Sequence, residues 1–366
     1  MFLLKFYEQN KNYISNTINE LIFCRNDETK SDTHIRDCLD LRRVMFIVEL
    51  SLVPVVIMAC YNTGYQAHIN HTLEGVETWR SALFDLLGFS LGQTSFWSSF
   101  IYGLLFFVPV YLTSMLVGGA WELFFAIMRR KKISEGLFVT GLIFSLLMPA
   151  SISLWQVALG ISFAIVIGKE IYGGTGRNLF NPALVGMAFL YYAYPQAINT
   201  FDANNLNFTL EQAFWGTIPG QLGTTSFFAC LVGAVVLLIS GLASWKIMFS
   251  MLIGMFFSSS VFNMIGAGIN PLFGLTPEWH LMTGGFAFAC VFLATDPISA
   301  TTTEMGKYYY GFFIGILGVI FRVMNPESTA FWMLAILVMN AMAPLIDHLV
   351  VKSNIYRRQK RELSNL

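Results

Sequence analysis

The chain has 366 residues, of which 55% are hydrophobic and only 12% are charged, and its formal net charge is zero. Soluble domains contain about 25% charged residues, so this composition excludes an ordinary soluble protein and predicts an all-α integral membrane protein. Because the net charge is zero, no electrostatic attraction to nucleic acid is expected. The five cysteines form no C-x-x-C pair, so neither a disulfide framework nor a metal site is expected.

Residues 1–43 carry charges throughout, which is typical of a cytoplasmic segment at the membrane surface. No basic stretch runs directly into an apolar one here, so no cleavable signal peptide is expected. Ten apolar segments follow, and each is interpreted as a membrane span, for which a helix needs about 20 apolar residues. The predicted spans are residues 44–61, 96–125, 137–148, 152–168, 183–194, 226–243, 247–265, 281–295, 308–323 and 330–351.

Basic residues between the spans predict the topology, because cytoplasmic loops are enriched in Lys and Arg. If the N-terminus is cytoplasmic, ten spans return the C-terminus to the same side. The basic clusters at residues 42–43, 129–132 and 352–361 then share that side, with Arg80 and Arg322 as exceptions. The predicted parts are a cytoplasmic segment, a first membrane repeat, an extracytoplasmic loop, a second membrane repeat and a cytoplasmic basic tail. These parts are residues 1–43, 44–195, 196–224, 225–351 and 352–366.

The two membrane parts resemble each other in sequence. Leu147-Met148-Pro149 has a counterpart in Thr295-Asp296-Pro297, and Asn181-Pro182 has one in Asn325-Pro326. Five spans per copy would place the two Asn-Pro steps on opposite sides of the membrane, which is the arrangement of an inverted repeat. Chance similarity between apolar segments is the alternative.

A glycine-rich loop separates the fourth and fifth predicted spans, and its central part reads Gly176-Arg177-Asn178-Leu179-Phe180-Asn181-Pro182. Glycines permit sharp bends, and Asn followed by Pro is typical of a helix start with Asn as the cap. Arg177, Asn178 and Asn181 supply one charge and two amides in one place. The loop, with Gly176, is therefore a candidate either for binding an anion or a cofactor such as a flavin, or for a structural turn.

Ionisable residues within or beside membrane spans are candidate functional residues, because a charge in lipid is costly. Glu122 follows Gly118 and Gly119, which permit close approach of a helix or a flat ligand. Glu122 is a candidate cation or proton site, and pairing with the basic cluster at 129–132 is the alternative. Lys169 and Glu170, just before the glycine-rich loop, are candidates for pairing with each other.

Two further acids are candidates. Asp296 precedes Ser299 and a run of three threonines, an all-oxygen set that suits a hard cation or hydrogen bonds to a flavin or phosphate. A helix cap is the equally weighted alternative. Asp347 stands beside His348 near the end of the tenth span. It is a candidate cation or proton site, and an interfacial residue is the alternative.

Several functional classes lack their motifs. The sequence has no Walker loop, no strand–turn–helix dinucleotide fingerprint, no H-E-x-x-H and no paired haem histidines within a span. An ATPase and a membrane cytochrome are therefore disfavoured, and no catalytic residue is assigned.

The loop Gly174-Thr175-Gly176-Arg177-Asn178-Leu179-Phe180-Asn181-Pro182-Ala183-Leu184 resembles the signature of the family that contains the B subunits of Na+-translocating NADH:quinone reductases and the D subunits of Rnf electron-transport complexes. Further motifs extend the resemblance, in order, along nearly the whole chain. They include His34-Ile35-Arg36-Asp37, Gly118-Gly119-Ala120-Trp121-Glu122, Ile218-Pro219-Gly220, Ala243-Ser244-Trp245-Lys246, Ala294-Thr295-Asp296-Pro297 and Ala343-Pro344-Leu345-Ile346-Asp347-His348.

The resemblance implies about ten membrane helices in two inverted five-helix repeats, similar to the urea-transporter architecture. It implies a subunit of a six-subunit complex in the bacterial inner membrane, in contact with lipid. The complex passes electrons from NADH through flavins to ubiquinone and exports Na+, and the subunit is not catalytic alone. By their match to the family's motifs, Gly118, Gly119, Glu122, Asp296 and Asp347 are expected on the quinone and Na+ path.

One family motif is missing. The family joins FMN through a phosphodiester bond to the Thr of a Ser-Gly-Ala-Thr motif after the fifth span, and residues 196–224 contain no such motif. No attachment threonine is therefore named, and FMN or riboflavin is expected only from the resemblance. The alternative function is a paralogue without flavin that acts as a channel or transporter for a small solute or ion on the same scaffold.

Overall fold

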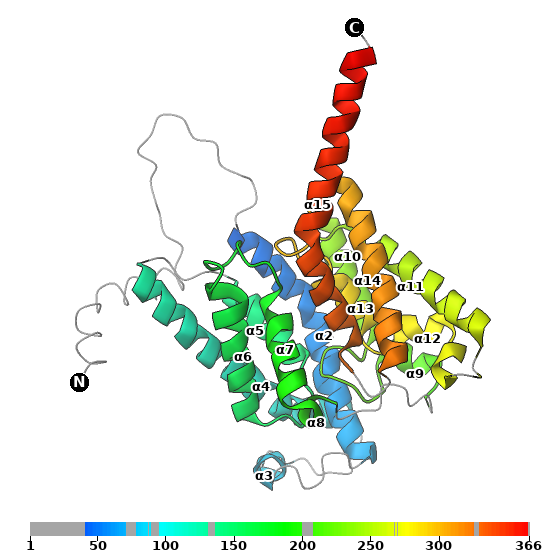
Figure 1. Ribbon diagram of the computed structural model, residues 1–366. Helices are drawn as coiled ribbons and strands as arrows, with labels where there is room; N and C mark the ends of the chain where they lie inside the picture. Colours follow the sequence, from blue (N-terminus) through cyan, green and yellow to red (C-terminus); the bar gives the residue numbers. More distant parts are fainter. Residues whose placement is uncertain are drawn as a thin grey trace.

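The computed structural model describes residues 41–70, 78–86, 88, 95–130, 136–199, 208–266, 268, 270–325 and 329–364. All regular structure in these ranges is helical, as the composition predicts (Figure 1). The predicted N-terminal segment lies outside the described residues up to position 40, and so do Lys131, Lys132 and Pro326.

Five of the described helices are long and apolar enough to cross a membrane. They are α2 (Leu41–Asn70), α4 (Phe96–Arg129), α11 (Trp245–Ile265), α14 (Glu304–Met324) and α15 (Phe331–Ser364). Each coincides with one predicted span, which confirms the positions of those five segments.

The other five predicted spans coincide with shorter helical segments that pack against the long helices. They are α5 (Leu137–Leu146), α6 (Leu154–Ile165) continued by the π-helical turn η1 (Val166–Glu170), α7 (Pro182–Ala193), α10 (Phe227–Ile239), and α13 (Phe286–Phe288) continued by the π-helical turn η3 (Ala289–Leu293). At 1.5 Å per residue these segments are shorter than a bilayer core of about 30 Å, so the count of ten spans stays a prediction.

The remaining described helices are short and join the larger ones. They are α3 (Thr78–Leu86), α8 (Pro195–Ile198), α9 (Leu210–Trp215), the 3-10 helix η2 (Pro271–Gly274) and α12 (Pro277–Met282). The predicted eighth span is therefore not one helix. It is broken between α12 and α13, where Gly284 and Gly285 have φ angles of 72° and 77°, a backbone conformation that favours glycine.

Contacts between helices follow the predicted repeat. In the first half α4 packs on α6, α6 on α7 and α5 on α7, and in the second half α11 packs on α14, α14 on α15 and η3 on α15. Between the halves, α2 packs on α10 and α7 on α15. The first segment of one copy thus meets the first of the other, and the fifth meets the fifth. We infer two five-segment repeats related by an approximate twofold axis.

The paired helices run in opposite directions, as an inverted repeat requires. Asn181, at the start of α7, donates from Nδ2 to Asp296, whereas Asn325, just before α15, donates from Nδ2 to the hydroxyl of Tyr191 near the end of α7 at 2.9 Å. Asn181 and Asn325 therefore lie at opposite ends of α7, which agrees with the inversion predicted from the sequence.

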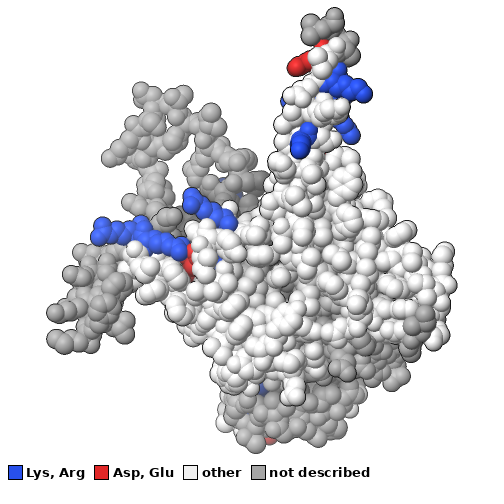
Figure 2. Space-filling view, in the orientation of Figure 1, with Lys and Arg blue, Asp and Glu red and all other residues white. Residues whose placement is uncertain are grey.

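Lysine and arginine side chains gather at one end of the bundle, called here the basic end. Helices α4 and α15 end there, and α11 and α14 begin there, joined by an ion pair between Lys246 and Glu304. Figure 2 shows the basic side chains in the upper part of the view, while the sides of the bundle are uncharged on this face. Beyond the bundle, α15 continues alone to Ser364 (Figure 1), so the described part of the predicted basic tail is helical.

Helix α2 continues nine residues past the predicted end of the first span at Tyr61. The polar side chains in this extension have partners, because Asn62 and Gln66 donate to the carbonyl oxygens of Ile218 and Thr217 at 2.8 and 2.7 Å. Polarity in the sequence therefore marks a contact inside the protein and not the end of the helix.

The predicted extracytoplasmic loop, residues 196–224, also folds against the bundle in its described part. The backbone N–H groups of Leu222 and Gly223 donate to the carbonyl oxygens of Met148 and Leu146 at 3.0 and 2.7 Å. These bonds satisfy the carbonyl of Leu146, the last residue of α5, and that of Met148 in the turn that follows.

The two arginines that are exceptions to the topology are buried. The Arg80 guanidinium lies 4.2 Å from the centre of the Phe106 ring, and that of Arg322 lies 5.2 Å from the centre of the Phe331 ring. Arg322 also donates to the hydroxyl of Thr283 at 2.8 Å. These arginines pack inside the bundle, where aromatic faces stabilise a cation, and do not mark a basic loop.

Candidate functional site

The glycine-rich loop turns the chain from η1 back to α7. Gly173, Gly174 and Gly176 have φ angles of 110°, 98° and 87°, which side chains disfavour. Asn181 caps α7, since its Oδ1 accepts the N–H of Ala183 at 3.0 Å, and this confirms the predicted helix start. The loop thus has the structural role that the sequence left open.

The residues of the loop that were candidates for an anion site divide into two groups. Gly176 and Arg177 are exposed, and neither lines the cavity described below. Asn178 and Asn181 are buried, and both line that cavity. Asn178 donates to the carbonyl of Phe180 at 2.9 Å, which stabilises the turn. The loop therefore presents amides, and not its cation, toward the interior.

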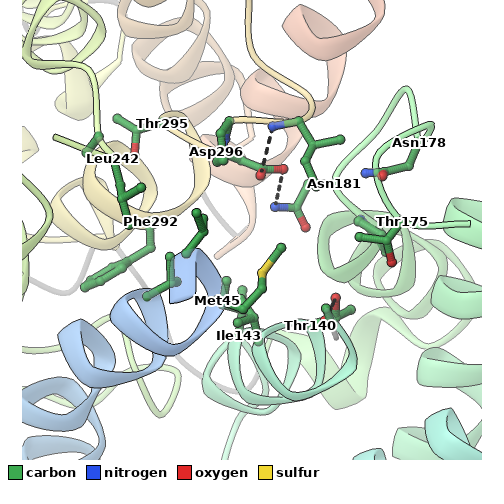
Figure 3. Close-up of a pocket in the computed structure, with 18 of the residues that line it drawn as sticks. Met45, Thr140, Ile143, Thr175, Asn178, Asn181, Leu242, Phe292, Thr295 and Asp296 are labelled. Carbon is green, nitrogen blue, oxygen red and sulfur yellow. Dashed lines mark hydrogen bonds between the residues drawn. The ribbon is translucent and has the colours of Figure 1, made fainter. Parts of the chain in front are cut away.

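Asp296 follows η3 and lies where the two repeats touch. Its carboxylate accepts hydrogen bonds from the Ser299 hydroxyl at 2.7 Å, from the Ile298 N–H at 3.3 Å and from Asn181 Nδ2 at 3.3 Å (Figure 3). The first two bonds are the local cap that the sequence offered as an alternative. The third joins the two repeats.

Asp296 lies in the loop after the predicted eighth span. Burial raises the pKa of its carboxyl above the usual range, and the hydrogen bonds from Ser299, Ile298 and Asn181 oppose this shift. The ionised carboxylate is therefore costly at this position. A bound cation would stabilise it.

A cavity of about 70 Å³, called here the interface cavity, lies between the two repeats beside Asp296 (Figure 3). Its polar lining comes from Thr140, Lys169, Thr175, Asn178, Asn181, Thr295 and Asp296, and the rest is apolar. Ligand pockets for drug-sized molecules measure about 300 Å³ or more, whereas one water needs about 10–15 Å³. The interface cavity is therefore suited to an ion with a few waters and is too small for a flavin or a quinone ring.

A second, more open cleft of about 460 Å³ lies on the other side of Asp296, at the basic end. It is lined in part by Lys246, Thr301, Glu304 and Lys307. Asp296 therefore lines both the cleft and the interface cavity.

Glu122 is buried and forms an ion pair with Lys169 of η1, which is also buried. One residue further on, Glu170 accepts a hydrogen bond from Arg129 at 2.9 Å. The expected pairing of Lys169 with Glu170 is therefore wrong, because Lys169 pairs with Glu122. Lys131 and Lys132 of the basic cluster lie outside the described residues. Consecutive residues of one helical turn point in different directions, so each reaches a separate partner on α4.

Gly118 and Gly119 lie one turn before Glu122, where α4 meets α5 and α6. A methyl group on Gly118 would lie 3.2 Å from Leu137 Cδ1 and 3.3 Å from Ile161 Cγ1. The glycines therefore allow close helix packing on this side. On the outer side of α4, the partly exposed Trp121 donates to Ser162 at 2.9 Å.

Asp347 caps α14 from the neighbouring helix α15. It accepts from the N–H groups of Thr302 and Thr303 at 2.9 and 3.1 Å and from their hydroxyls at 3.1 and 2.5 Å. These four bonds fix the end of the loop that begins at Asp296. The structure thus brings Asp296 and Asn181 together, and it places Asp347 and Glu122 in separate contacts.

Sequence reasoning missed several members of the site. Thr140 and Lys169 line the interface cavity, and the Asn340 amide donates to the Tyr310 hydroxyl at 2.5 Å inside the bundle. A single hydroxyl or amide in an apolar helix is a weak signal, because it can also bond to its own backbone. Within the described ranges, no three His, Cys, Asp or Glu side chains form a group that could hold a metal ion.

The described threonines of residues 196–224 do not stand in a flavin-attachment motif. Thr209 accepts the N–H of Gln212 at 3.3 Å as the cap of α9, and Thr217 and Thr224 donate to backbone carbonyls. Thr200 lies outside the described residues. These threonines serve local structure and stand outside the attachment motif.

The fold and the site define a helical membrane protein in which two inverted repeats meet at a half-buried carboxylate beside an ion-sized cavity. Residues 28–356 match the model of the NQR2, RnfD, RnfE family, and the chain belongs to this family.

Similar proteins include one from Chromohalobacter salexigens, 45% identical over 359 residues that cover 91% of this chain and 87% of that protein. Another, from Ectopseudomonas mendocina, is 45% identical over 365 residues (92% and 90%), and one from Azotobacter vinelandii is 43% identical over 364 residues (92% and 90%). All three are named as the B subunit of a Na(+)-translocating NADH-quinone reductase.

Proposed function

We propose that this chain is the B subunit of a redox-driven sodium pump that transfers electrons from NADH to ubiquinone and exports Na+. The observation that carries the proposal is the 43–45% identity to proteins of that name over 91–92% of the chain. In this proposal the chain works in a six-subunit complex of the bacterial inner membrane. The basic end faces the cytoplasm, because basic residues mark cytoplasmic ends.

We propose that Na+ enters from the basic end and meets Asp296 and then Glu122. Support comes from Asp296, which lines both the cleft at the basic end and the interface cavity, and from the carboxylate, amide and hydroxyl oxygens in the polar part of the cavity lining. Lys169 lines the same cavity and contacts Glu122. Asn181 and Asp347 contribute by holding Asp296 and the loop that follows it.

The segment from Gly118 to Glu122 is proposed to contact ubiquinone. Its glycines face α5 and α6, and Trp121 offers a partly exposed aromatic face beside them. Aromatic rings stack on flat apolar ligands, which suits a quinone ring.

No step of this proposal passes through FMN on this chain, because its described threonines do not fit the attachment. We propose that any FMN or riboflavin held here is bound without a phosphodiester bond to threonine. After denaturing electrophoresis the band of this subunit should show no flavin fluorescence. A fluorescent band would contradict this part of the proposal.

The test of the function is to express the chain with its partner subunits and to measure NADH oxidation by ubiquinone with and without Na+. Turnover stimulated by Na+, and lost when this chain is omitted, is the expected result. The missing attachment motif favours a second function, a channel or transporter without flavin. In that case the purified chain alone would be colourless, would not co-purify with reductase subunits, and would carry ion flux in liposomes.

A further inference from the structure

We propose that Lys169 is a tethered cation that occupies the carboxylate of Glu122 and gives way when Na+ binds there. The inference rests on the proposed function, and it assigns to Lys169 control over the affinity of the Na+ path. Its starting point is the buried ion pair between Lys169 and Glu122.

The pair is enclosed by the protein. The side chains of Lys169 and Glu122 are each only 2% exposed. A carboxylate taken out of water must be compensated by a positive charge, because an unpaired buried charge is strongly destabilising. Lys169 supplies a positive charge at Glu122 Oε1. In this proposal another monovalent cation takes the place of the ammonium at that oxygen.

The position of Lys169 gives an incoming ion access to the pair. Lys169 lines the interface cavity, Glu122 does not, and the two side chains form an ion pair. A Cβ atom on Gly136, which also lines the cavity, would lie 3.8 Å from Lys169 Nζ, so the ammonium group lies near the cavity wall. Lys169 therefore links the cavity that Asp296 lines to the carboxylate of Glu122.

Lysine is suited to such an exchange. Its ammonium is a compact charge on a flexible four-carbon stem, and it can move without the backbone. When Na+ takes the Glu122 oxygens, the ammonium can turn into the interface cavity, where the Asp296 carboxylate and the amide oxygens of Asn178 and Asn181 can accept its hydrogen bonds. In this exchange the Lys169 ammonium contacts Glu122 before Na+ binds, and Na+ contacts it afterwards.

The neighbouring ion pair provides a matched control. Arg129 and Glu170 join the same two elements, α4 and η1, but the Arg129 side chain is 29% exposed and does not line the interface cavity. Breaking this pair disturbs the same helix contact without touching Glu122. A change in Na+ affinity that occurs in the Lys169 variants but not in Arg129→Gln therefore indicates competition for Glu122 and not weakened helix packing.

The experiment measures NADH:ubiquinone turnover of the assembled complex against Na+ concentration for Lys169→Met, Lys169→Arg, Arg129→Gln and the parent chain. If Na+ binds only while the ammonium is displaced, the apparent affinity is reduced by the fraction of time that Glu122 is free of Lys169. Removing the competitor in Lys169→Met should lower the KM for Na+ about tenfold. Lys169→Arg should raise it, because a guanidinium holds a carboxylate with two bonds. Arg129→Gln should leave it within about twofold of the parent.

The outcomes separate the two proposals. A parent complex whose turnover ignores Na+ refutes the proposed function itself. A Na+-stimulated parent with an unchanged or raised KM in Lys169→Met overturns only the tethered-cation proposal. If Lys169→Met does not assemble, Lys169→Arg decides, since it keeps the charge: a raised KM supports the proposal, and an equal or lower KM overturns it.

Discussion

Replacing Asn181 with Asp puts a second carboxylate against Asp296. The cap of α7 survives, because Asp accepts the N–H of Ala183 as well as Asn does. The bond to Asp296 is lost, since an oxygen replaces the amide nitrogen that lies 3.3 Å from Asp296 Oδ2. Two unit charges 3.3 to 4 Å apart repel by about 4 to 5 kcal/mol at an effective dielectric constant of about 20.

A small cation between the two carboxylates cancels this repulsion, so the variant should become dependent on Na+ for stability. Thermal unfolding of the purified complex, in NaCl and in choline chloride of equal ionic strength, measures the effect. Because 1 kcal/mol shifts Tm by about 2 °C or more in domains of moderate size, Asn181→Asp should lose at least about 5 °C in choline and regain most of it in Na+.

The internal repeat supplies the control for this experiment. Asn325 occupies the corresponding position but donates to the Tyr191 hydroxyl, which can itself donate to a carboxylate. Asn325→Asp should therefore show no such difference between Na+ and choline. If Asn181→Asp unfolds at the same temperature in both salts, the contact with Asp296 is not a cation site and the reasoning fails.

The remaining predictions concern packing, capping and titration, and thermal unfolding tests each. In Gly254→Ala the new methyl group would overlap the carbonyl oxygen of Phe312, so α11 and α14 must separate, at a cost of about 2 kcal/mol or more. Gly118→Ala meets only side-chain atoms, at 3.2 and 3.3 Å, and should cost less than about 1 kcal/mol. Asp347→Ala removes the cap of α14 and should cost about 1–3 kcal/mol. Because burial raises the pKa of Asp296, ionisation destabilises the fold; Asp296→Asn should be more stable than the parent near pH 7, and the difference should vanish below the usual Asp pKa of about 3.9.

A specific result would contradict each of these predictions. Equal stability of the two glycine variants would show that α11 and α14 can separate at little cost in free energy. Full stability of Asp347→Ala would mean that the cap is dispensable. A stability difference for Asp296→Asn that does not change with pH would show that the carboxyl titrates as it does in the unfolded chain.

The helical segments could be predicted because apolar runs are local properties of the sequence. The prediction fails where a polar residue has a partner far away in the sequence. Asn62 and Gln66 look like the end of a span until the carbonyls of residues 217–218 are seen to accept their hydrogen bonds. The break in the eighth segment had a visible signal, the pair Gly284-Gly285, which the hydropathy pattern alone does not weigh.

The site was predicted residue by residue but not as an arrangement. Asp296 and Asn181 were each singled out for their chemistry, yet only the fold shows that they touch across the repeats. The partner of Lys169 was predicted wrongly, because Lys169 has an acidic neighbour in sequence and a different one in space. Pairings over such separations depend on how the helices pack, which residue types alone do not reveal.

The two repeats of this protein share a backbone arrangement but differ in the charge of a corresponding side chain. Asp296 in the second copy corresponds to Met148 in the first, a buried side chain whose polarizable sulfur carries no charge. On the proposed Na+ path, a cation would therefore find a carboxylate at this position in one half of the scaffold and an uncharged thioether at the corresponding position in the other.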